Sequence, residues 1–486
     1  MVQSDSKTAR ELARGIVARL QDAGFEAFWV GGCVRDLQLG REPEDYDIAT
    51  SARPEQIEAL FPRTKAVGRR FGVMLVIEQG REFQVATFRA EADYRDGRRP
   101  SRVRFADARA DARRRDFTIN GLFLDPVAGR LYDWVGGQND LRARLIRTIG
   151  APEERFAEDH LRMLRAIRLA ANLEFEIEPR TLEAIRALAP NIQRVSAERI
   201  RDELNRLFLP PPDIGPAVPP PAGDTGAGTP TGRRAARGLE LLRQSGLLEV
   251  VLPELAATIP CEQPPDYHPE GTVFTHLVLM LKHLPANPPP SLPWAVLLHD
   301  IAKPVTATRD PQTGERHFYE HDKVGAEMAA RILRRLRFPN KQIEEIVTCV
   351  RHHMQFKDAP RMRKATLRRM LLRPTFALEL ELHRLDCLGS HRRLDIYEFL
   401  RAEAEALARQ PQIRPPLVKG QDLIKLGMKP GPALGRMLAE IRELQLQEEL
   451  KTRAEALRWA RRRLADTPLA PDATAEVPSN RPNGRS

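Results

Sequence analysis

The chain has 486 residues and a net charge of +11, and 42% of its residues are hydrophobic and 29% charged. This length is too great for one ordinary hydrophobic core, so we expect two to four domains of a soluble, globular composition. No run of about 18 apolar residues is present, which excludes a membrane-spanning helix, and the excess of cations is compatible with polyanionic partners.

Residues 1–20 have the pattern of an amphipathic helix and lack the apolar core of a signal peptide. The cysteines are far apart in the sequence and form no CxxC pair: Cys33, Cys261, Cys349 and Cys387. Such spacing indicates neither a disulfide framework nor a cysteine-rich zinc site. We therefore expect a cytoplasmic protein, because cysteines stay reduced there.

Residues 25–135 alternate short β-like runs with turns. The runs include FEAFWVGG, EDYDIAT, RFGVMLVIE, REFQVATFR and DFTINGLFLD. They are rich in β-branched and aromatic residues and are bounded by Gly, Pro and Asp, as strands usually are. This pattern predicts a sheet-containing first domain.

Two features of this region suit nucleotide chemistry. Gly31 and Gly32 lie between a predicted strand and a predicted helix, where backbone amides can approach a triphosphate. Asp45 and Asp47 are two residues apart in an extended run, so both carboxylates face one side. Such a pair can hold Mg²⁺ against nucleotide phosphates, although an isolated DxD is usually a solvated acidic turn.

Two later segments carry arginines beside acidic or amide groups. The first is RRRDFTIN, an arginine-rich turn suited to a triphosphate, with Arg114, Arg115, Asp116 and Asn120. The second is RFAEDHLRMLRAIRLA, in a region of helical periodicity from residue 153 to 208, with Glu158, Asp159, Arg162, Arg165 and Arg168. An Asp159–Arg162 pair is either a surface salt bridge or an acceptor and a fork of donors that can pair with a base.

These motifs in this order resemble the class II tRNA nucleotidyltransferase and bacterial poly(A) polymerase family, over residues 25–210. The resemblance implies a nucleotidyltransferase head in which Asp45 and Asp47 are catalytic and bind Mg²⁺. It implies that Asp159 and Arg162 read CTP or ATP by pairing with the base, with Arg199 in a motif beside them. The nucleotide-binding residues that it implies are Gly31, Gly32, Arg35, Arg115, Asp116, Asn120, Asp159, Arg162, Arg165 and Arg168.

One position departs from the family pattern. Family members commonly carry a third acidic residue in the strand before a TTFR-like sequence, and here that strand reads EFQVATFR with Gln84 at the position. Gln84 cannot act as an anionic base or metal ligand. Either two carboxylates suffice, which we favour, or Glu82 on the same strand face takes part.

The second half of the chain holds nearly all the histidines. His276, the pair His299-Asp300 and Asp386 match the order of an HD phosphohydrolase, and imidazole with carboxylate is a common ligand set for a divalent transition metal. His321 and His352 fall where extended versions of that site add ligands. The alternative is a structural remnant of an HD domain. We favour a metal-bound phosphohydrolase module, which certain bacterial tRNA nucleotidyltransferases carry at this place.

The C-terminal segment GQDLIKLGMKPGPALGRML resembles the tail of those HD-bearing enzymes. Gly427 and Gly431 predict turns between short helices, and Lys425, Lys429 and Arg436 supply cations near them. Such cations suit phosphate contacts to a folded RNA. Considered without the resemblance, the segment is a helical hairpin with a basic face.

The function we expect is addition of CCA to the 3′ end of tRNA from CTP and ATP. The tRNA 3′ end, CTP and ATP are the expected partners, with no membrane and no obligate protein partner. A rival is an A-only enzyme, because VGRRFGVMLV around Arg69 and Arg70 faintly resembles a signature of poly(A) polymerases. A third hypothesis is an HD hydrolase whose head only binds RNA, which the intact Asp45 and Asp47 disfavour.

The expected fold class is α+β, with a small mixed-sheet nucleotidyltransferase head followed by mostly α-helical neck, HD and tail domains. The predicted intervals are a head at 1–150, a helical neck at 151–209, a Pro/Gly-rich linker at 210–234, an HD domain at 235–409, a C-terminal helical tRNA-binding module at 410–465 and a disordered tail at 466–486.

Overall fold

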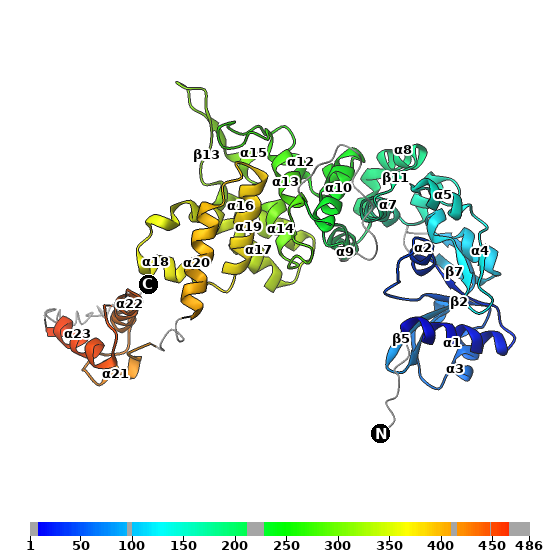
Figure 1. The fold of residues 1–486 in the computed structure, drawn as a ribbon, viewed down its shortest axis with the longest axis horizontal. Coiled ribbons are helices and arrows are strands. Elements are labelled where there is room, and N and C mark those ends of the chain that lie inside the picture. The colour runs from blue at the N-terminus through cyan, green and yellow to red at the C-terminus, as the bar shows by residue number, and fades with distance from the viewer. Residues whose placement is uncertain (1–7, 95–99, 211–227, 410–415, 448, 466–486) are drawn as a thin grey trace, which may run out of the picture. The chain divides into compact units, whose positions relative to one another are not determined.

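The computed structural model describes residues 8–94, 100–210, 228–409, 416–447 and 449–465, without the side chains of Arg70 and residues 91–104 (Figure 1). Most of the predicted linker and the whole predicted tail therefore lie outside the described residues. The chain divides into two compact units, one formed by Met1–Phe356 with Ala377–Leu394 and the other by Lys357–Phe376 with Asp395–Ser486.

The first unit begins with a mixed seven-stranded sheet, as the sequence predicts. Its strands are Ala27–Val30 (β1), Ile48–Thr50 (β2), Thr64–Gly68 (β3), Val73–Glu78 (β4), Arg81–Thr87 (β5), Phe123–Asp125 (β8) and Arg130–Tyr132 (β9), in the order β3-β4-β5-β2-β1-β8-β9. Strands β2 and β5 pair in parallel, whereas β1 pairs antiparallel with both β2 and β8. A separate antiparallel ribbon joins Arg89–Tyr94 (β6) to Pro100–Phe105 (β7).

Short helices accompany this sheet: Ala9–Asp22 (α1), Gly32–Gln38 (α2), Pro54–Leu60 (α3), Ala108–Arg113 (α4) and Gly137–Ala143 (α5). Helix α1 forms where the sequence predicts an amphipathic helix. The Thr8 hydroxyl accepts from the Glu11 amide and the Glu11 carboxylate accepts from the Thr8 amide, which satisfies two amides at the helix start. Its apolar stripe, which includes Ile16 and Leu20, is buried in the core that it shares with the sheet.

The neck contains Pro152–Glu158 (α6), Leu161–Leu173 (α7), Pro179–Leu188 (α8) and Ala197–Phe208 (α9), with Leu145–Ile146 (β10) paired in parallel with Glu176–Ile177 (β11). The sequence predicts one helix through Glu158 and Arg168, but the chain breaks between α6 and α7. Asp159 has φ of −150° and ψ of 105°, so it lies outside both helices. Its side chain can thus point in a direction that a helical residue could not take.

Helix Pro230–Gln244 (α10) begins inside the interval predicted to be a linker. Residues 230–234 instead form its first turn, where the Thr229 hydroxyl accepts from the Gly232 amide. A Cβ at Gly232 would lie 2.2 Å from the carbonyl oxygen of Lys282, so glycine is needed for the close approach of α10 to the C-terminal end of helix Val273–Lys282 (α13). The glycine therefore serves helix packing at this position, and composition alone could not distinguish that use from a flexible linker.

The remaining helices of the first unit are Leu247–Val251 (α11), Pro253–Ala256 (α12), Val273–Lys282 (α13), Leu292–Leu298 (α14), Lys303–Thr306 (α15), His321–Arg335 (α16), Asn340–His352 (α17) and most of Phe376–Gly389 (α19), with a hairpin of Ala307–Arg309 (β12) and Arg316–Phe318 (β13). Their apolar faces continue the core; Trp294 of α14, for example, is fully buried. Among the described residues, no helix combines the length and apolar character required to cross a membrane.

The second unit contains Lys364–Leu371 (α18), Asp395–Arg409 (α20), Gly420–Ile424 (α21), Pro432–Leu446 (α22) and Arg453–Ala465 (α23). The interval 235–409 predicted for the HD domain is therefore divided, because α18 and α20 lie in this unit. Leu423, Met437 and Ile441 contribute to its separate core. Gly427 and Gly431 have positive φ, in agreement with the turn predicted between α21 and α22.

Candidate active site and metal centre

The turn from β1 into α2 brings together Gly31, Asp47 and Arg115. Gly31 has φ of 76°, and a Cβ there would lie 3.0 Å from Nη1 of Arg115 and 4.0 Å from Oδ2 of Asp47. The Arg115 guanidinium is fixed by an ion pair with Asp111 at 3.1 Å and lies over the Phe123 ring. A cation and a carboxylate therefore approach the backbone at the start of the helix.

Asp45 and Asp47 directly precede β2 and are both exposed, whereas Tyr46 and Ile48 between and after them are buried. This alternation agrees with the predicted placement of both carboxylates on one side. The Val30 amide donates to the Asp47 carbonyl at 3.0 Å and fixes this segment beside β1. Partial desolvation raises the pKa of Asp47 above its usual value; Arg115 opposes the shift and the Asp45 charge adds to it.

Gln84 lies on the same side of the sheet as Asp47. Val85 pairs with Ile48 in the parallel β2–β5 ladder, and both are buried, so their neighbours Gln84 and Asp47 face the opposite side, where both are exposed. Glu82, also exposed, is held by Lys65 at 2.6 Å. This ion pair favours two carboxylates, Asp45 and Asp47, over a participating Glu82.

A chain of polar contacts connects the head to the neck. Arg35 donates to Asn120 at 2.9 Å, and Asn120 donates to Asp116 at 3.3 Å. Asp116 accepts two hydrogen bonds from Arg165 of α7, at 2.9 and 2.6 Å. Burial opposes ionisation of Asp116, but the Arg165 charge outweighs it and lowers the pKa of that carboxyl. The predicted Asp116 and Arg165 thus form a buried ion pair that fixes α7 to the head.

Glu203 of α9 holds the end of the predicted arginine stripe. Arg168 donates to its carboxylate at 2.7 Å, and Arg165 lies 3.9 Å from it. Glu203 is buried, and the sequence analysis did not identify it. Arg168 is therefore tied to a neighbouring helix, as in the salt-bridge interpretation of this stripe.

Asp159 does not pair with Arg162, because both have other partners. Arg199 of α9 donates to both Asp159 oxygens, at 3.2 and 2.7 Å. Arg162 pairs with Glu158 and donates to the carbonyl oxygens of Arg155 and Arg114. Asp159 and Arg162, which are predicted to pair with the base, are thus each held in position by hydrogen bonds and ion pairs to other protein groups.

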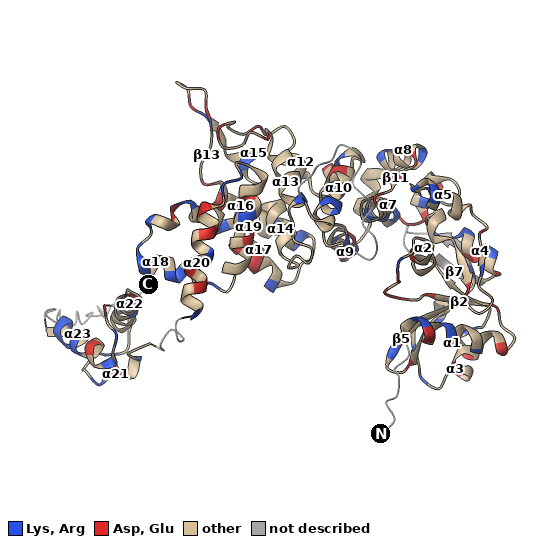
Figure 2. Ribbon diagram, viewed as in Figure 1, with Lys and Arg blue, Asp and Glu red and all other residues tan. Residues whose placement is uncertain are grey.

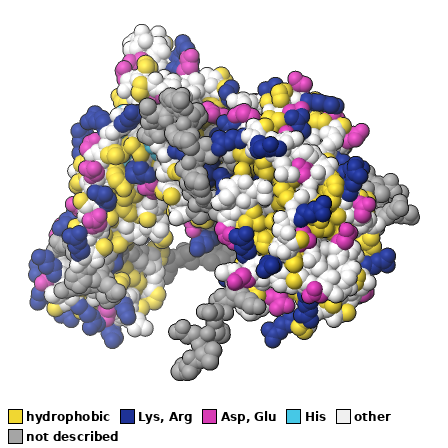
Figure 3. Space-filling model, turned by 45° about the vertical axis from the view of Figure 1, so that its right-hand side comes forward, with side chains coloured by type: hydrophobic (Ala, Val, Ile, Leu, Met, Phe, Trp, Pro, Cys, Tyr) yellow, Lys and Arg dark blue, Asp and Glu magenta, His cyan; other side chains and the backbone are white. Residues whose placement is uncertain are grey.

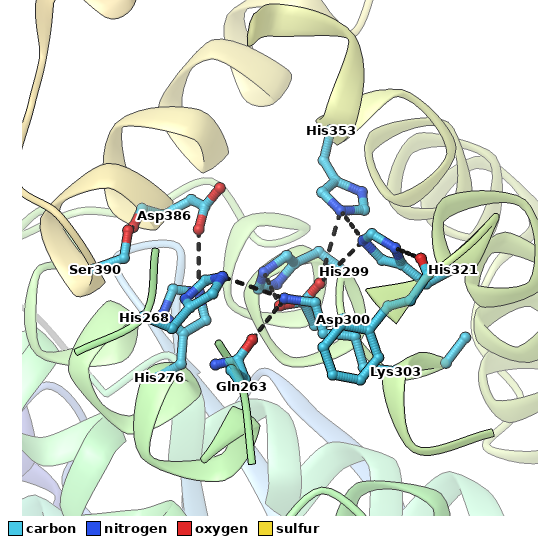
Figure 4. A network of polar contacts seen from close by, with 12 residues as sticks. Gln263, His268, His276, His299, Asp300, Lys303, His321, His353, Asp386 and Ser390 are labelled. Carbon is cyan, nitrogen blue, oxygen red and sulfur yellow. Dashed lines mark hydrogen bonds and ion pairs between the residues drawn. The ribbon is translucent and has the colours of Figure 1, made fainter. Parts of the chain in front are cut away.

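The histidine cluster lies in the helical part of the first unit (Figure 4). His276 comes from α13, His299 and Asp300 follow α14, His321 begins α16 and His353 follows α17. Two sets of potential ligand atoms, each within 4.8 Å of one another, share Asp300: His276, His299 and Asp300 form one, and Asp300, His321 and His353 form the other.

Three of these histidines have the same orientation. The Nδ1 atoms of His299, His321 and His353 lie 2.7–2.9 Å from the backbone carbonyls of Val296, Phe318 and Val350. A carbonyl only accepts, so each Nδ1 carries a proton, and a ring in this orientation presents an Nε2 lone pair whenever it is neutral. Nε2 of His321 lies 3.2 Å from Nε2 of His353, where two lone pairs would repel without a cation between them.

Asp300 is buried among positive groups. Its oxygens lie 2.7 Å from Lys303 Nζ, 3.2 Å from Nε2 of His299 and 3.5 Å from Nε2 of His321. Burial opposes its ionisation, but His299 and Lys303 lower the pKa of Asp300 well below its usual range. The buried Lys303 also donates to Gln263 at 2.6 Å.

His276 is fully buried between two carboxylates. Its Nδ1 lies 2.8 Å from Glu270 and its Nε2 lies 3.1 Å from Asp386. Burial opposes protonation, but the contacts with Asp386 and Glu270 outweigh it and raise the pKa of His276 to about 9. The same Glu270 oxygen lies 2.8 Å from Nδ1 of His268.

The predicted HD ligands His276, His299, Asp300 and Asp386 thus lie together, and His321 joins them. His352 does not belong to this cluster, because its Nδ1 lies 3.8 Å from Glu379, and the neighbouring His353 takes the predicted position. The sequence VRHHM contains both histidines at a helix end, where periodicity does not decide which one faces inward. Glu270, Lys303 and Gln263 were also missed.

The donor set fits a divalent transition metal. In the described part of the chain, buried Nε2 of His299 and both ring nitrogens of His276 lack a partner in hydrogen-bonding geometry, despite the carboxylates near them. Imidazole and carboxylate together suit such metals, and the ligand atoms are close enough to share one. Oxygen ligands alone, as Asp45 and Asp47 offer, suit Mg²⁺ instead.

Lys425, Lys429 and Arg436 are all exposed in the second unit. Lys425 and Lys429 flank Gly427 in the turn after α21, and Arg436 lies in the first turns of α22. Their exposure leaves the predicted RNA contacts sterically open.

Three sequence families match separate parts of the chain. Residues 27–147 match the poly A polymerase head domain, residues 174–212 match the probable RNA and SrmB-binding site of polymerase A, and residues 272–385 match the HD domain. These matches cover the sheet with Asp45 and Asp47, the helices around Arg199, and the histidine cluster.

Curated relatives are CCA-adding enzymes. That of Staphylococcus aureus strain MRSA252 is 48% identical over 203 residues, which are 42% of this chain and 50% of the relative. That of Bacillus licheniformis is 47% identical over 194 residues, which are 40% of this chain and 49% of the relative. The chain thus aligns with about half the length of the curated relatives it matches.

Solved structures are similar over more of the chain. The Bacillus stearothermophilus CCA-adding enzyme in complex with CTP has a TM-score of 0.69 and 28% identity, over 95% of this chain and 98% of that one. The Thermotoga maritima CCA-adding enzyme complexed with tRNA has a TM-score of 0.53 and 19% identity, over 93% and 95%, and shares the fold. The family domains, the relatives and this fold agree with the motifs of the sequence. The chain therefore carries matches to a poly A polymerase head domain, a probable RNA-binding segment and an HD domain, and it resembles CCA-adding enzymes in sequence and fold.

Proposed function

We propose that this protein adds CCA to the 3′ end of tRNA, using CTP and ATP and releasing pyrophosphate. The observation that carries the proposal is the meeting of Asp47 and Arg115 at Gly31, with Asp45 on the same exposed side. Relatives at 47–48% identity over this region are CCA-adding enzymes, and a similar solved structure binds CTP. The cytoplasm is the compartment we propose, in line with the four free cysteines.

In the head, Asp45 and Asp47 are the ligands we assign to Mg²⁺, which when bound stabilises charge on the transferring phosphoryl group. Arg115 lies where it can hold the triphosphate near the Gly31 backbone, and its link to Asp111 limits its movement. The tRNA 3′-hydroxyl attacks the α-phosphorus, the bond to the pyrophosphate breaks, and the hydroxyl proton passes to solvent or a carboxylate.

Base choice is assigned to Asp159 and Arg162. A carboxylate accepts and a guanidinium donates, which together complement the edge of a base. Arg199 and Glu158 orient the two side chains by the contacts described above. The groups that read the nucleotide are therefore protein side chains, and no nucleic-acid template is needed.

The HD domain is proposed to be a metal-dependent phosphohydrolase. His276, His299, Asp300 and Asp386 would hold one divalent transition metal, and Asp300, His321 and His353 form a second possible set of ligands. A metal in such a site activates water for attack on phosphorus. The Nδ1 hydrogen bonds to backbone carbonyls hold three of the imidazoles with Nε2 inward, so this chain supplies the orientation.

The test of nucleotide addition uses tRNA lacking CCA and single labelled nucleotides. We expect CTP to be added first and ATP only after it, and Asp47→Asn to reduce incorporation by about three orders of magnitude, because the metal contributes several kcal/mol to the transition state. Glu82→Gln is the matched control on the neighbouring strand and should retain activity. Incorporation of ATP alone by the parent, or normal activity of Asp47→Asn, would refute the proposal.

A further inference from the structure

Two cavities lie where the head meets the neck. The first, of about 460 Å³, lies among the segments around η2 (Thr118–Asn120), β10, α6 and α8. The second, of about 490 Å³, lies between α4 and the end of α6. The second cavity adjoins the residues that hold Arg162, because Glu158 and Arg114 line it and both contact Arg162. Arg113 and Arg155 line both cavities, so the two are neighbours. Arg114, from the arginine-rich turn predicted for the triphosphate, lines the second cavity, whereas Asp45, Asp47, Arg115, Asp159 and Arg162 line neither.

The lining is strongly basic. Six arginines line the two cavities against three carboxylates, those of Asp107, Glu158 and Glu178. We call these arginines the arginine groove: Arg109, Arg113, Arg114, Arg147, Arg155 and Arg180. The basic segments on α4 and α8 are visible in Figure 2. A surplus of guanidinium groups in a hollow favours an anionic occupant.

Four of the arginines have ion-pair partners in the protein. Arg147 pairs with Asp140 and Glu178, Arg155 with Glu158 and the Ile149 carbonyl, and Arg114 with Asp111. Arg180 lies 3.8 Å from Glu153. These contacts limit the movement of Arg114, Arg147 and Arg155, whereas Arg180, whose side chain is 66% exposed, forms only a surface ion pair.

Arg109 and Arg113 are different. Both are exposed, they lie four residues apart on α4, and neither has a hydrogen-bond or ion-pair partner recorded among the described residues. Residues at this spacing are neighbours on one helix face. Two guanidinium groups without a carboxylate partner, side by side at the mouth of a basic hollow, are available to a ligand with more than one phosphate.

We propose that the arginine groove binds the phosphate backbone of the RNA substrate, outside the site that receives its 3′ end. This inference rests on the proposed function, which supplies an RNA chain next to the same domain. Two neighbouring cavities that share Arg113 suit a polymer with repeated phosphates better than one small anion. Trp134 also lines the first cavity and offers an aromatic surface of the kind on which bases stack.

The test compares two double variants of the full-length protein. Arg109→Ala with Arg113→Ala removes the two available groove cations, and Arg331→Ala with Arg334→Ala on α16 removes two exposed arginines elsewhere. Binding of tRNA lacking CCA is measured by filter retention between roughly 50 and 200 mM salt. Each phosphate contact contributes about 0.7–0.9 to the slope of log K against log salt, so the groove variant should lose about 1.5 from the slope. The control should keep the slope of the parent.

Steady-state kinetics and the binding of CTP alone show whether the groove contacts the RNA or the nucleotide triphosphate. We expect the groove variant to raise the KM for tRNA about tenfold while leaving kcat and the KM for CTP and ATP unchanged. A tRNA slope equal to that of the control overturns the proposal, and so does weakened binding of CTP alone, which would assign the groove to the triphosphate. If the groove variant has a smaller salt slope than the parent but the parent adds no nucleotide, the proposed function is wrong and the RNA-binding role of the arginine groove is retained.

Discussion

Gly31 has φ of 76° and ψ of −133°, a backbone conformation that side chains with a Cβ rarely adopt. Gly31→Ala would in addition place a methyl group 3.0 Å from Arg115 Nη1, in the space where we assign the triphosphate. We expect a loss of about 1–3 kcal/mol in the free energy of unfolding, together with loss of nucleotide addition. Urea denaturation and an incorporation assay measure the two effects.

The matched control is Gly15→Ala. Gly15 lies in α1, is exposed, and has nothing within 4 Å of the position of a Cβ. Alanine should stabilise this helix by about 0.5–1 kcal/mol and leave activity unchanged. If Gly31→Ala and Gly15→Ala had the same free energy of unfolding and the same nucleotide incorporation, the Gly31 backbone would have no special role.

Glu270 is a positioning residue in the histidine cluster. The other three cluster histidines are oriented by backbone carbonyls, whereas His276 has the Glu270 carboxylate 2.8 Å from Nδ1. A carboxylate behind a metal-binding imidazole makes it a stronger ligand, and its loss typically weakens metal binding about 10–100-fold. We expect Glu270→Gln to raise the Kd for Mn²⁺ or Ni²⁺ by that factor in isothermal titration.

Glu262→Gln serves as the control, because Glu262 is exposed and its carboxylate pairs with Arg316, away from the histidine cluster. The melting temperature of the metal-free Glu270→Gln variant shows whether folding is retained. A folded variant that binds the ion as tightly as the parent would exclude Glu270 from the site.

At the scale of elements, the break between α6 and α7 determines what Asp159 can do. A single helix through residues 158–168 would have paired Asp159 with Arg162, and instead Arg199 of α9 holds it with two hydrogen bonds. A lysine lacks the planar fork needed for this geometry. Arg199→Lys should therefore keep the charge but loosen the discrimination of CTP and ATP against GTP and UTP.

The loss of one charge-assisted hydrogen bond, about 1.5–3 kcal/mol, corresponds to a roughly 10–100-fold change in nucleotide preference. Competition between labelled nucleotides on one tRNA measures it. Arg201→Lys, on the same helix but paired with Asp202, should leave the preference intact. If Arg199→Lys also leaves it intact, the Asp159–Arg199 pair is only a structural salt bridge.

The elements also show which inferences a sequence can support. That the Asp45 and Asp47 side chains project to the same side was predictable, because side chains alternate with a period of two in an extended segment. The place of His353 in the cluster was not predictable. His352 and His353 are adjacent at a helix end, and only the packing of α17 determines which of them faces the cluster. Glu270 and Lys303 escaped notice because their partners, His276 and Gln263, are brought to them by the fold.

The polar residues of the neck illustrate the same limit. Sequence identified Asp116 and Arg165 as nucleotide-binding residues, whereas their mutual ion pair across 49 positions is a tertiary contact. Glu203, which anchors Arg168, lies four residues after Arg199 in the same segment, but its contact with Arg168 is formed only by the fold. The start of α10 at Pro230 was likewise hidden, because Gly and Pro there serve close helix packing and not a linker.

At the scale of the whole molecule, the chain combines two chemistries in separate sets of elements. Asp45, Asp47 and Arg115 belong to the sheet of the head, and the histidine cluster belongs to helices after α10. Basic side chains are spread over the face seen in Figure 3, interleaved with acidic ones, and histidine is barely visible there. His276, His299, His321 and His353 are instead buried in the cluster, which suits the proposed metal centre.

This separation predicts that one chemistry can be removed without the other. Replacing both His299 and Asp300 by Ala should abolish metal-dependent hydrolysis of a cyclic or terminal phosphate, and nucleotide addition should continue. Because Asp300 holds the buried Lys303 at 2.7 Å, its loss leaves an unpaired buried cation, which costs about 3–5 kcal/mol. Melting temperatures must therefore accompany both assays.

Asp386→Asn provides a milder variant, since the Asp386 side chain is 31% exposed and, among the described residues, its carboxylate contacts His276 and no buried lysine. It should also lose hydrolysis, because an amide neutralises the charge near the metal, but it should stay folded at the temperature of the assay. Hydrolysis at the parent's rate in a folded variant would reject the metal assignment. If a folded variant instead loses nucleotide addition, the head and the HD domain are coupled, and the contacts of α10 with α7 and α9 on one side and with α13 on the other are the route to examine.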